Sequence, residues 1–186
     1  MIKEDKLGYR VLAFEPSTVN YEHLKTNLQK NICNNVIPHK KAISDHTGFV
    51  EFISVTGNLT ASHISGSREY HGNVKKEKVE TIAFRDLNVR PDFLKIDVEG
   101  HESVVIKSIN YDDWENIDAI VEIHSETNAK EIFDYFYITE NLKRNNAIKI
   151  FSHKTLWREV INVEDMPKNN KEGNILITSK NKINWD

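Results

Sequence analysis

The chain has 186 residues, of which 39% are hydrophobic and 28% are charged, and its formal net charge is −3. This length and composition predict one globular domain over residues 1–186 and argue against intrinsic disorder. The low net charge carries no electrostatic signature of nucleic-acid or membrane binding. Cys33 is the only cysteine, and neither a leader peptide nor a membrane-spanning run is visible, so a cytoplasmic protein is the default expectation.

The first half of the chain alternates predicted strands with one helix. Residues 10–15 form an apolar strand, which ends at Pro16 because proline lacks the amide donor that a central strand needs. A helix to about residue 30 follows, with Ser17 or Thr18 as its N-cap. A second short strand and its exit are predicted at 36–37 and 42–43, and further strands are predicted at 49–55 and 78–82. The polar segment 56–73 is predicted to be a long loop, and such loops in compact domains are usually functional or disordered.

The second half continues the alternation and then turns β-rich. A strand at 93–97 precedes a helix at 100–109, and a strand at 117–123 precedes a helix that Asn128 can cap. Apolar residues at 148–150, 156–163 and 175–177 predict a β-rich C-terminal end that closes as an antiparallel pair around the loop Pro167–Gly173. The pattern as a whole predicts an α/β fold with a mostly parallel sheet in a three-layer sandwich and an antiparallel C-terminal hairpin.

Three of the apolar runs end in a carboxylate, at Glu15, Asp97 and Glu122. In an open α/β sheet, ligands bind outside the carboxyl ends of the strands, so these acids are candidates for binding a ligand. Structural roles are the alternative. Glu15 and Asp97 would then cap the helices that follow them, and Glu99 with Glu102 would form an acidic first helical turn.

Several segments resemble, in order, those of FkbM family methyltransferases, from about Gly8 to Thr178. The string FLKIDVEGHE over Phe93–Glu102 resembles the most recognisable motif of the family. The other matching segments are Val11–Pro16, Lys41–Ser44 with Thr47–Phe52, Ile120–His124 and Asn174–Ile177. The resemblance implies a Rossmann-like class I methyltransferase fold. It also implies S-adenosylmethionine-dependent O-methyl transfer to a hydroxyl of a small molecule, sugar or glycoconjugate.

The resemblance also implies roles for particular residues. Glu15 would accept hydrogen bonds from the ribose hydroxyls of S-adenosylmethionine, because an ionised carboxylate accepts two such bonds at once. Pro16, Ala42 and Asp97 would complete the cofactor-binding set. Asp97 and Glu99 would be the catalytic pair, acting as general base on the acceptor hydroxyl or orienting it.

Acceptor recognition is predicted for side chains that can hydrogen-bond a hydroxylated molecule. These are Ser62, His63 and Tyr70 in the long polar segment, together with His124. Lys95, inside an apolar strand, is expected to form an ion pair with an acid such as Glu122.

A metal site is the less favoured interpretation of one group of polar residues. His101, Glu122 and His124 add to Asp97 and Glu99, and such a group could ligate a metal ion. The sequence has no HxxxH pair and no paired cysteines, so we expect no metal.

The chain departs from the family pattern in two places. The family opens with a strand and a glycine-rich Asp-x-Gly-Ala-Asn-x-Gly turn, whereas only about ten residues precede Val11 and no two of the seven glycines are closer than six positions. We therefore expect the first strand and helix to be missing and S-adenosylmethionine to bind weakly. Phe84-Arg85-Asp86 also has one acid fewer than the Leu-Asp-Asp of the family.

Two further interpretations stay open. The chain could be a non-catalytic, truncated or decayed scaffold that binds a partner or a carbohydrate, or a nucleotide-binding α/β protein of another kind. An in-frame glycine-rich stretch upstream of Met1 would favour the enzyme. A missing strand would also expose a sheet edge, through which a homo-oligomer could form.

Overall fold

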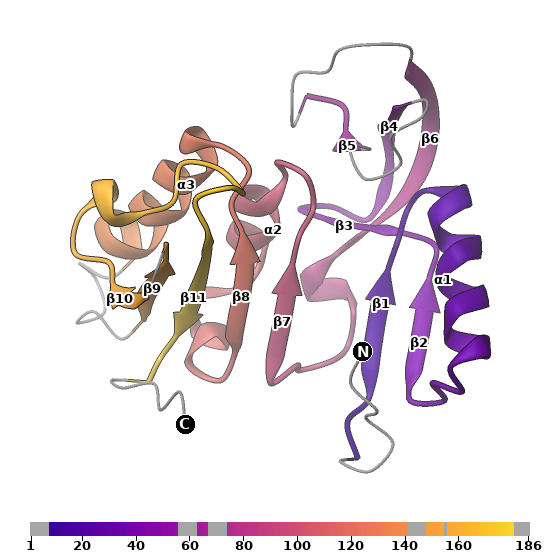
Figure 1. Ribbon diagram of the computed structural model, residues 1–186, viewed down its shortest axis with the longest axis horizontal. Helices are drawn as coiled ribbons and strands as arrows, with labels where there is room; N and C mark the ends of the chain where they lie inside the picture. Colours follow the sequence, from indigo (N-terminus) through magenta and orange to yellow (C-terminus); the bar gives the residue numbers. More distant parts are fainter. Residues whose placement is uncertain (1–7, 56–62, 67–73, 141–147, 155, 181–186) are drawn as a thin grey trace. The chain divides into compact units, whose positions relative to one another are not determined.

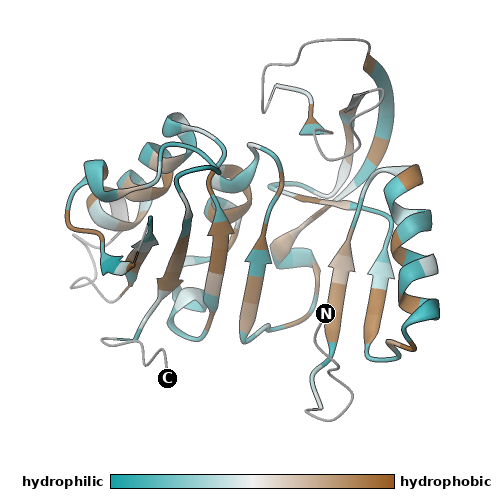
Figure 2. Ribbon diagram, in the orientation of Figure 1, coloured by the Kyte–Doolittle hydropathy of each residue, from teal (hydrophilic) through white to brown (hydrophobic). Residues whose placement is uncertain are grey.

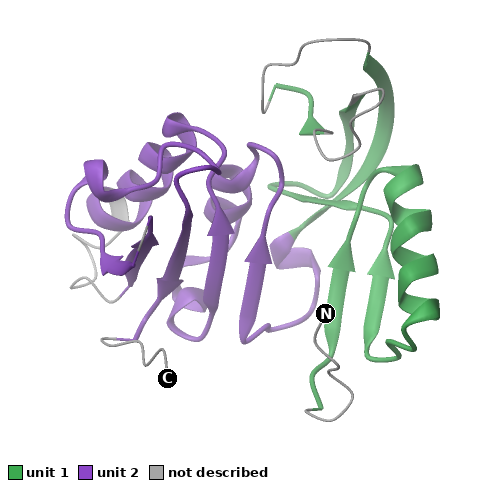
Figure 3. Cartoon of the chain, in the orientation of Figure 1, with its two compact units in different colours: residues 1–83 green, residues 84–186 purple. Residues whose placement is uncertain are grey.

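The computed structural model describes residues 8–55, 63–66, 74–140, 148–154 and 156–180. The chain divides into two compact units, unit 1 with residues 1–83 and unit 2 with residues 84–186 (Figure 3). The single domain expected from the sequence stays a prediction. Within the described part of the chain, no helix combines the length and the apolar character needed to cross a bilayer.

Unit 1 begins with a parallel strand pair joined by a helix (Figure 1). Strand β1 (Val11–Phe14) pairs with β2 (Val36–His39), and helix α1 (Thr18–Lys30) connects them. Ser17 is the N-cap of α1, as one of the two predicted alternatives, and its hydroxyl accepts a hydrogen bond from the backbone amide of Asn20 at 3.5 Å. The strand ends before Pro16, as its missing amide hydrogen predicts.

A second, mixed sheet completes unit 1. Its strands are β3 (Ala42–Ser44), β6 (Val74–Ala83), β4 (Gly48–Val55) and β5 (His63–Ile64), in that spatial order. Strand β3 runs parallel to β6, and the other neighbours are antiparallel. Strand β5 lies within the segment predicted to be a polar loop. It forms because Ile64 pairs with Phe52 and joins a buried cluster, whose members are Ala42, Phe52, Ile64 and Val79.

Unit 2 is built on one five-stranded sheet. Its strands are β10 (Trp157–Glu159), β9 (Lys149–His153), β11 (Asn174–Thr178), β8 (Asp118–Glu122) and β7 (Phe93–Ile96), in that spatial order. Hydrophobic residues follow the central strands β8 and β11 in Figure 2. The side chains of Val121, Ile150, Ile175 and Ile177 are 0% exposed, so the middle of this sheet is core.

The sheets are mixed, and the expected mostly parallel sheet is not confirmed. Of the eight described strand pairings, three are parallel and five are antiparallel. The C-terminal strands are antiparallel, since β9 pairs with both β10 and β11. The pair predicted to close around the loop 167–173 is not formed, because β9 lies between β10 and β11. Only three residues separate β9 from β10, too few for a parallel pair, which needs a crossover of a dozen or more residues. The three-layer arrangement stays a prediction.

Helix α2 (Glu102–Ser108) and helix α3 (Glu126–Phe133) pack against each other within unit 2. Helix α3 continues into a π-helical segment, Asp134–Glu140. Short 3₁₀ helices occupy Phe84–Asp86, Tyr111–Glu115 and Val163–Asp165. Trp114 and Phe136 are both 0% exposed, and their ring centroids are 5.3 Å apart in an edge-to-face contact.

Ser125, and not Asn128, caps helix α3, so that prediction was wrong. Ser125 has extended backbone angles, and its hydroxyl accepts a hydrogen bond from the Asn128 amide at 3.1 Å. Asn128 lies in the first helical turn, where its side chain forms hydrogen bonds with the backbone of Ser103 and Gly100. Both residue types are good N-caps, which is why the pattern did not distinguish them.

Replacing Ser125 with alanine is expected to lower the free energy of unfolding by about 1 kcal/mol, because the Asn128 amide loses its acceptor. Chemical denaturation followed by circular dichroism measures the change. The Ser125→Asp variant is the matched control, since aspartate caps helices about as well as serine and should retain the stability. Equal losses in both variants would contradict the capping role.

Candidate functional site

The turn after β7 carries two acidic residues, Asp97 and Glu99. It runs from Asp97 to Gly100 and leads into α2. Glu99 has φ of 51° and Gly100 has φ of 99°, so two successive residues adopt left-handed backbone angles. Such angles strain a residue with a side chain, and strain of this kind concentrates at functional sites. The turn brings Asp97 and Glu99 beside the end of the neighbouring strand β8.

Glu102 is the buried anchor of this turn. It is the first residue of α2 and is 0% exposed. Its Oε1 accepts hydrogen bonds from the amides of Val98 at 3.3 Å and Gly100 at 2.9 Å, and it lies 2.8 Å from Nδ1 of His124. The structural alternative for Glu102 was a place in an acidic first helical turn, and Glu102 does begin α2. That pattern gave no signal that its side chain points inward.

His124 follows β8 and is surrounded by four acids, which we call the acidic group: Asp97, Glu99, Glu102 and Glu122. Its side chain is 3% exposed. Because Glu102 Oε1 is an acceptor, Nδ1 of His124 carries the proton of their shared hydrogen bond. Its Nε2 lies 3.4 Å from Glu99 Oε2, 3.8 Å from Asp97 Oδ1 and 3.9 Å from Glu122 Oε1. Among the described residues, Nε2 has no hydrogen-bond partner.

Two opposing effects act on the pKa of His124. Burial lowers it, whereas the hydrogen bond to Glu102 and the negative charges of Glu102, Glu99 and Asp97 raise it by more, so the net shift is upward. The surrounding carboxylates therefore stabilise a positive charge near Nε2. A buried histidine with a shifted pKa beside partly exposed acids is a typical feature of a functional site.

Lys95 forms the ion pair that the sequence analysis expected. Its Nζ lies 3.1 Å from Asp97 Oδ2 and 3.9 Å from Glu122 Oε2. The lysine side chain is 55% exposed, and exposed ion pairs contribute little to stability. The side chains of Asp97 and Glu122 are themselves 42% and 29% exposed, so both keep access to solvent.

Asn128 is a site residue that sequence reasoning missed. It is 6% exposed, and its Oδ1 accepts a hydrogen bond from the Ser103 amide at 2.9 Å. Its Nδ2 donates to the Gly100 carbonyl at 2.8 Å. The first turn of α3 therefore holds the acidic turn and the start of α2 in place. These contacts join residues 25 and 28 positions apart, so no local pattern could reveal them.

In unit 1, Glu15 follows β1 and contacts the start of α1. Its Oε1 accepts a hydrogen bond from the Ser17 amide at 2.8 Å, which is the helix-capping contact of the structural alternative. Burial raises the pKa of Glu15, and hydrogen bonds from Ser17 and Asn20 oppose that rise. The other two cofactor candidates of unit 1 are Pro16, which precedes the cap, and Ala42, which is buried in the apolar cluster with Phe52.

The predicted acceptor-binding residues are placed as follows. His63 lies in β5 and is 2% exposed, so its ring packs inside unit 1. Ser62 and Tyr70 lie outside the described residues. His124 lies in the acidic group of unit 2. His101 directly precedes α2, and it is not among the three residues whose ligand atoms converge, which are Asp97, Glu122 and His124.

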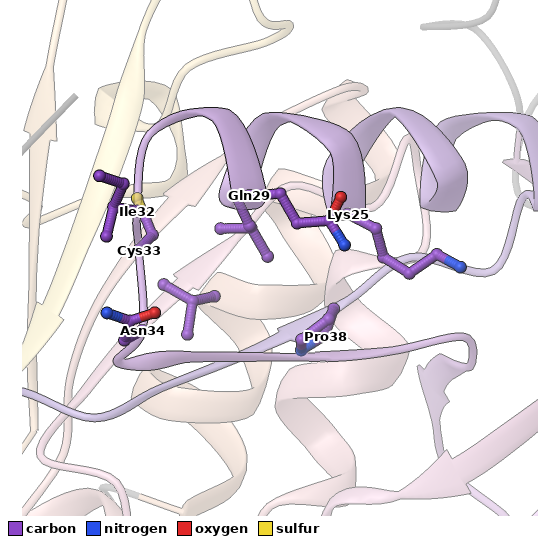
Figure 4. Close-up of a pocket in the computed structure, with 8 residues that line it drawn as sticks. Lys25, Gln29, Ile32, Cys33, Asn34 and Pro38 are labelled. Carbon is purple, nitrogen blue, oxygen red and sulfur yellow. The ribbon is translucent and has the colours of Figure 1, made fainter.

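A shallow hollow in unit 1 contains none of the predicted site residues. It measures about 460 Å³ and lies between α1 and β2 (Figure 4). Figure 4 labels Lys25, Gln29, Ile32, Cys33, Asn34 and Pro38 around it. Because the lining has no carboxylate, the chemistry predicted at the strand ends does not belong to this hollow.

Comparisons with known proteins place the chain in a family. The profile of the Methyltransferase FkbM domain matches residues 1–148. The hexuronic acid methyltransferase AglP of Haloferax volcanii is 28% identical over 142 residues, which cover 66% of this chain and 50% of AglP. The chain thus spans half the length of this curated relative.

A solved structure shares the fold. The crystal structure of Methyltransferase FkbM from Methylobacillus flagellatus matches with a TM-score of 0.55 and 14% sequence identity. The match covers 90% of this chain and 36% of that one. The motif over Phe93–Glu102 lies inside the profile match, as the sequence resemblance implied. The chain belongs to the FkbM methyltransferase family.

Proposed function

We propose that this protein transfers a methyl group from S-adenosylmethionine to a hydroxyl of a sugar or another small hydroxylated molecule. The observation that carries the proposal is the family match over residues 1–148, which includes the strained acidic turn. The similarity to a hexuronic acid methyltransferase favours a sugar acid as the acceptor.

The acidic group of unit 2 suits the acceptor side of this reaction. The methyl group of S-adenosylmethionine is already activated, so the protein needs mainly to align the hydroxyl and to accept its proton. Asp97 is 42% exposed and Glu99 is 21% exposed, so a bound acceptor can reach both carboxylates. We assign Asp97 to orienting the hydroxyl and Glu99 to accepting the proton. His124 contacts both and holds their arrangement.

Glu15 suits the ribose of the cofactor. Burial raises its pKa, because the buried carboxylate receives less hydrogen bonding than a carboxylate in water. Two ribose hydroxyls would supply hydrogen-bond donors to the end of β1. Pro16, Ala42 and Asp97 stay predicted cofactor contacts, and Ser62, His63, Tyr70 and His124 stay predicted acceptor contacts.

The proposal is tested by following radiolabelled methyl transfer from S-adenosylmethionine to acceptors by the whole protein. Glucuronic and galacturonic acid are compared with glucose and galactose. We expect methylation of the sugar acids and an alkali-stable methyl ether as product. An alkali-labile methyl ester would contradict a hydroxyl target, and no transfer to any hydroxylated acceptor would contradict the proposal as a whole.

Replacing Glu15 with glutamine is expected to weaken S-adenosylmethionine binding by at least about tenfold, since a hydrogen bond to a charged group contributes about 1.5–3 kcal/mol. Glutamine can still accept the Ser17 amide, so the start of α1 should stay folded. Isothermal titration calorimetry measures the affinity, and Glu22→Gln on the exposed face of α1 is the control. Unchanged affinity in the Glu15 variant would rule out the ribose role.

A further inference from the structure

Three potential metal ligands converge at one edge of the unit 2 sheet. Asp97 follows β7 and Glu122 ends β8, and these strands are parallel neighbours with Ile96 paired to Val121. Their carboxyl ends therefore meet at the same edge. His124 lies two residues beyond Glu122. One ligand atom from each of the three residues lies within 4.8 Å of the other two.

The buried imidazole supplies an observation independent of the acids. The His124 side chain is 3% exposed, and among the described residues its Nε2 has no hydrogen-bond partner. Its Nδ1 bonds to the buried Glu102, so Nε2 of the neutral ring presents a lone pair toward carboxylate oxygens. Metal-binding histidines show this arrangement, since their second nitrogen usually donates to a carboxylate that fixes the ring.

The excess of negative charge in this group also favours the binding of a cation. Four carboxylates, those of Asp97, Glu99, Glu102 and Glu122, surround His124, and Lys95 is the cation that the structure pairs with two of them. The lysine side chain is 55% exposed, so it can move into solvent at little cost. A divalent ion between Nε2 and the acids would offset the remaining repulsion.

We propose that Asp97, Glu122 and His124 bind a divalent transition-metal ion, with Glu102 orienting the imidazole. One nitrogen and two carboxylate oxygens suit Mn²⁺ or Zn²⁺ better than Ca²⁺ or Mg²⁺, which prefer oxygen ligands alone. Ligands bonded at about 2.1 Å stand about 3–4 Å apart. The distances of 3.8 Å and 3.9 Å from Nε2 to the two carboxylates fall in this range, and both acids are exposed enough to adjust.

This site adds a metal ion to the proposed function, and its link to methyl transfer rests on that function. Three protein ligands leave coordination positions open, where a hydroxyl and the carboxylate of a sugar acid can bind together. A bound hydroxyl loses its proton more readily. Metal binding itself is measured without cofactor or acceptor, so its failure is distinct from a failure of methyl transfer.

The test is titration of the chelator-treated whole protein with MnCl₂ and with ZnCl₂, followed by calorimetry. We expect one site per chain, at least about tenfold weaker in the His124→Gln and Asp97→Asn variants. Spin-echo spectroscopy of the Mn²⁺ complex should show coupling to an imidazole nitrogen that is lost in His124→Gln. The control is His46→Gln, which removes the exposed histidine 2.7 Å from Asp45 and should leave binding unchanged.

A second variant keeps the proposal falsifiable if the histidine variant does not fold. Lys95→Met removes the competing positive charge from an exposed position, so we expect about fivefold tighter Mn²⁺ binding. Weaker or unchanged binding in that variant would overturn the proposal. So would the lack of saturable Mn²⁺ or Zn²⁺ binding to the wild-type protein, because a proton alone would then occupy Nε2.

Discussion

Replacing Glu102 with alanine is expected to lower the free energy of unfolding by about 3–5 kcal/mol, which is the usual cost of removing one partner from a buried charged group. The carboxylate is 0% exposed and accepts from the amides of Val98 and Gly100 and from Nδ1 of His124. Alanine would leave the half-buried amides and the buried imidazole without this acceptor and would also leave a cavity. The acidic turn should lose its shape together with the stability.

Urea denaturation followed by tryptophan fluorescence measures this loss, since Trp114 lies in the core of the same unit. The matched control is Glu126→Ala. Glu126 is likewise the first residue of a helix in unit 2, but its side chain is 75% exposed and forms a 3.6 Å ion pair with Lys168. The control should lose less than about 1 kcal/mol. Similar losses at both positions would show that Glu102 does not anchor the turn.

Replacing Gly173 with alanine is expected to destabilise unit 2 by about 3–5 kcal/mol through backbone strain and overlap. Gly173 has φ of 140°, and an added Cβ would lie 1.8 Å from the carbonyl oxygen of His153 and 2.8 Å from its carbonyl carbon. Both are backbone atoms of β9, next to the pairing of Asn174 with His153. The new methyl group cannot rotate away, so β9 and β11 must separate.

A second glycine separates the cost of the steric overlap at position 173 from the cost of the left-handed backbone angle. Gly8 has φ of 71° and nothing within 4 Å of an added Cβ, so Gly8→Ala carries only the cost of the left-handed angle, about 1 kcal/mol. Thermal unfolding by calorimetry compares the two variants. Equal destabilisation would show that β9 does not restrict position 173.

Local pattern predicted much of the element order and several of the candidate site residues. Proline lacks an amide donor, so the end of the first strand before Pro16 was predictable. The run ending at Asp97 was predicted to be a buried strand, but β7 is an edge strand in which Phe93 is 54% exposed and Ile96 is buried. The motif that follows it is continuous in the sequence. The β5 strand at His63 was missed, because two residues are too few for a period to show.

The strand-end acids and the FkbM resemblance thus came from the sequence alone, because short-range spacing and a contiguous motif carry them. Only the tertiary structure decided that Glu102 is buried, that it orients His124, and that Asn128 holds the turn. Their hydrogen bonds link positions 22, 25 and 28 residues apart. Whether a polar side chain is buried depends on what the rest of the chain packs around it, and local spacing carries no record of that packing.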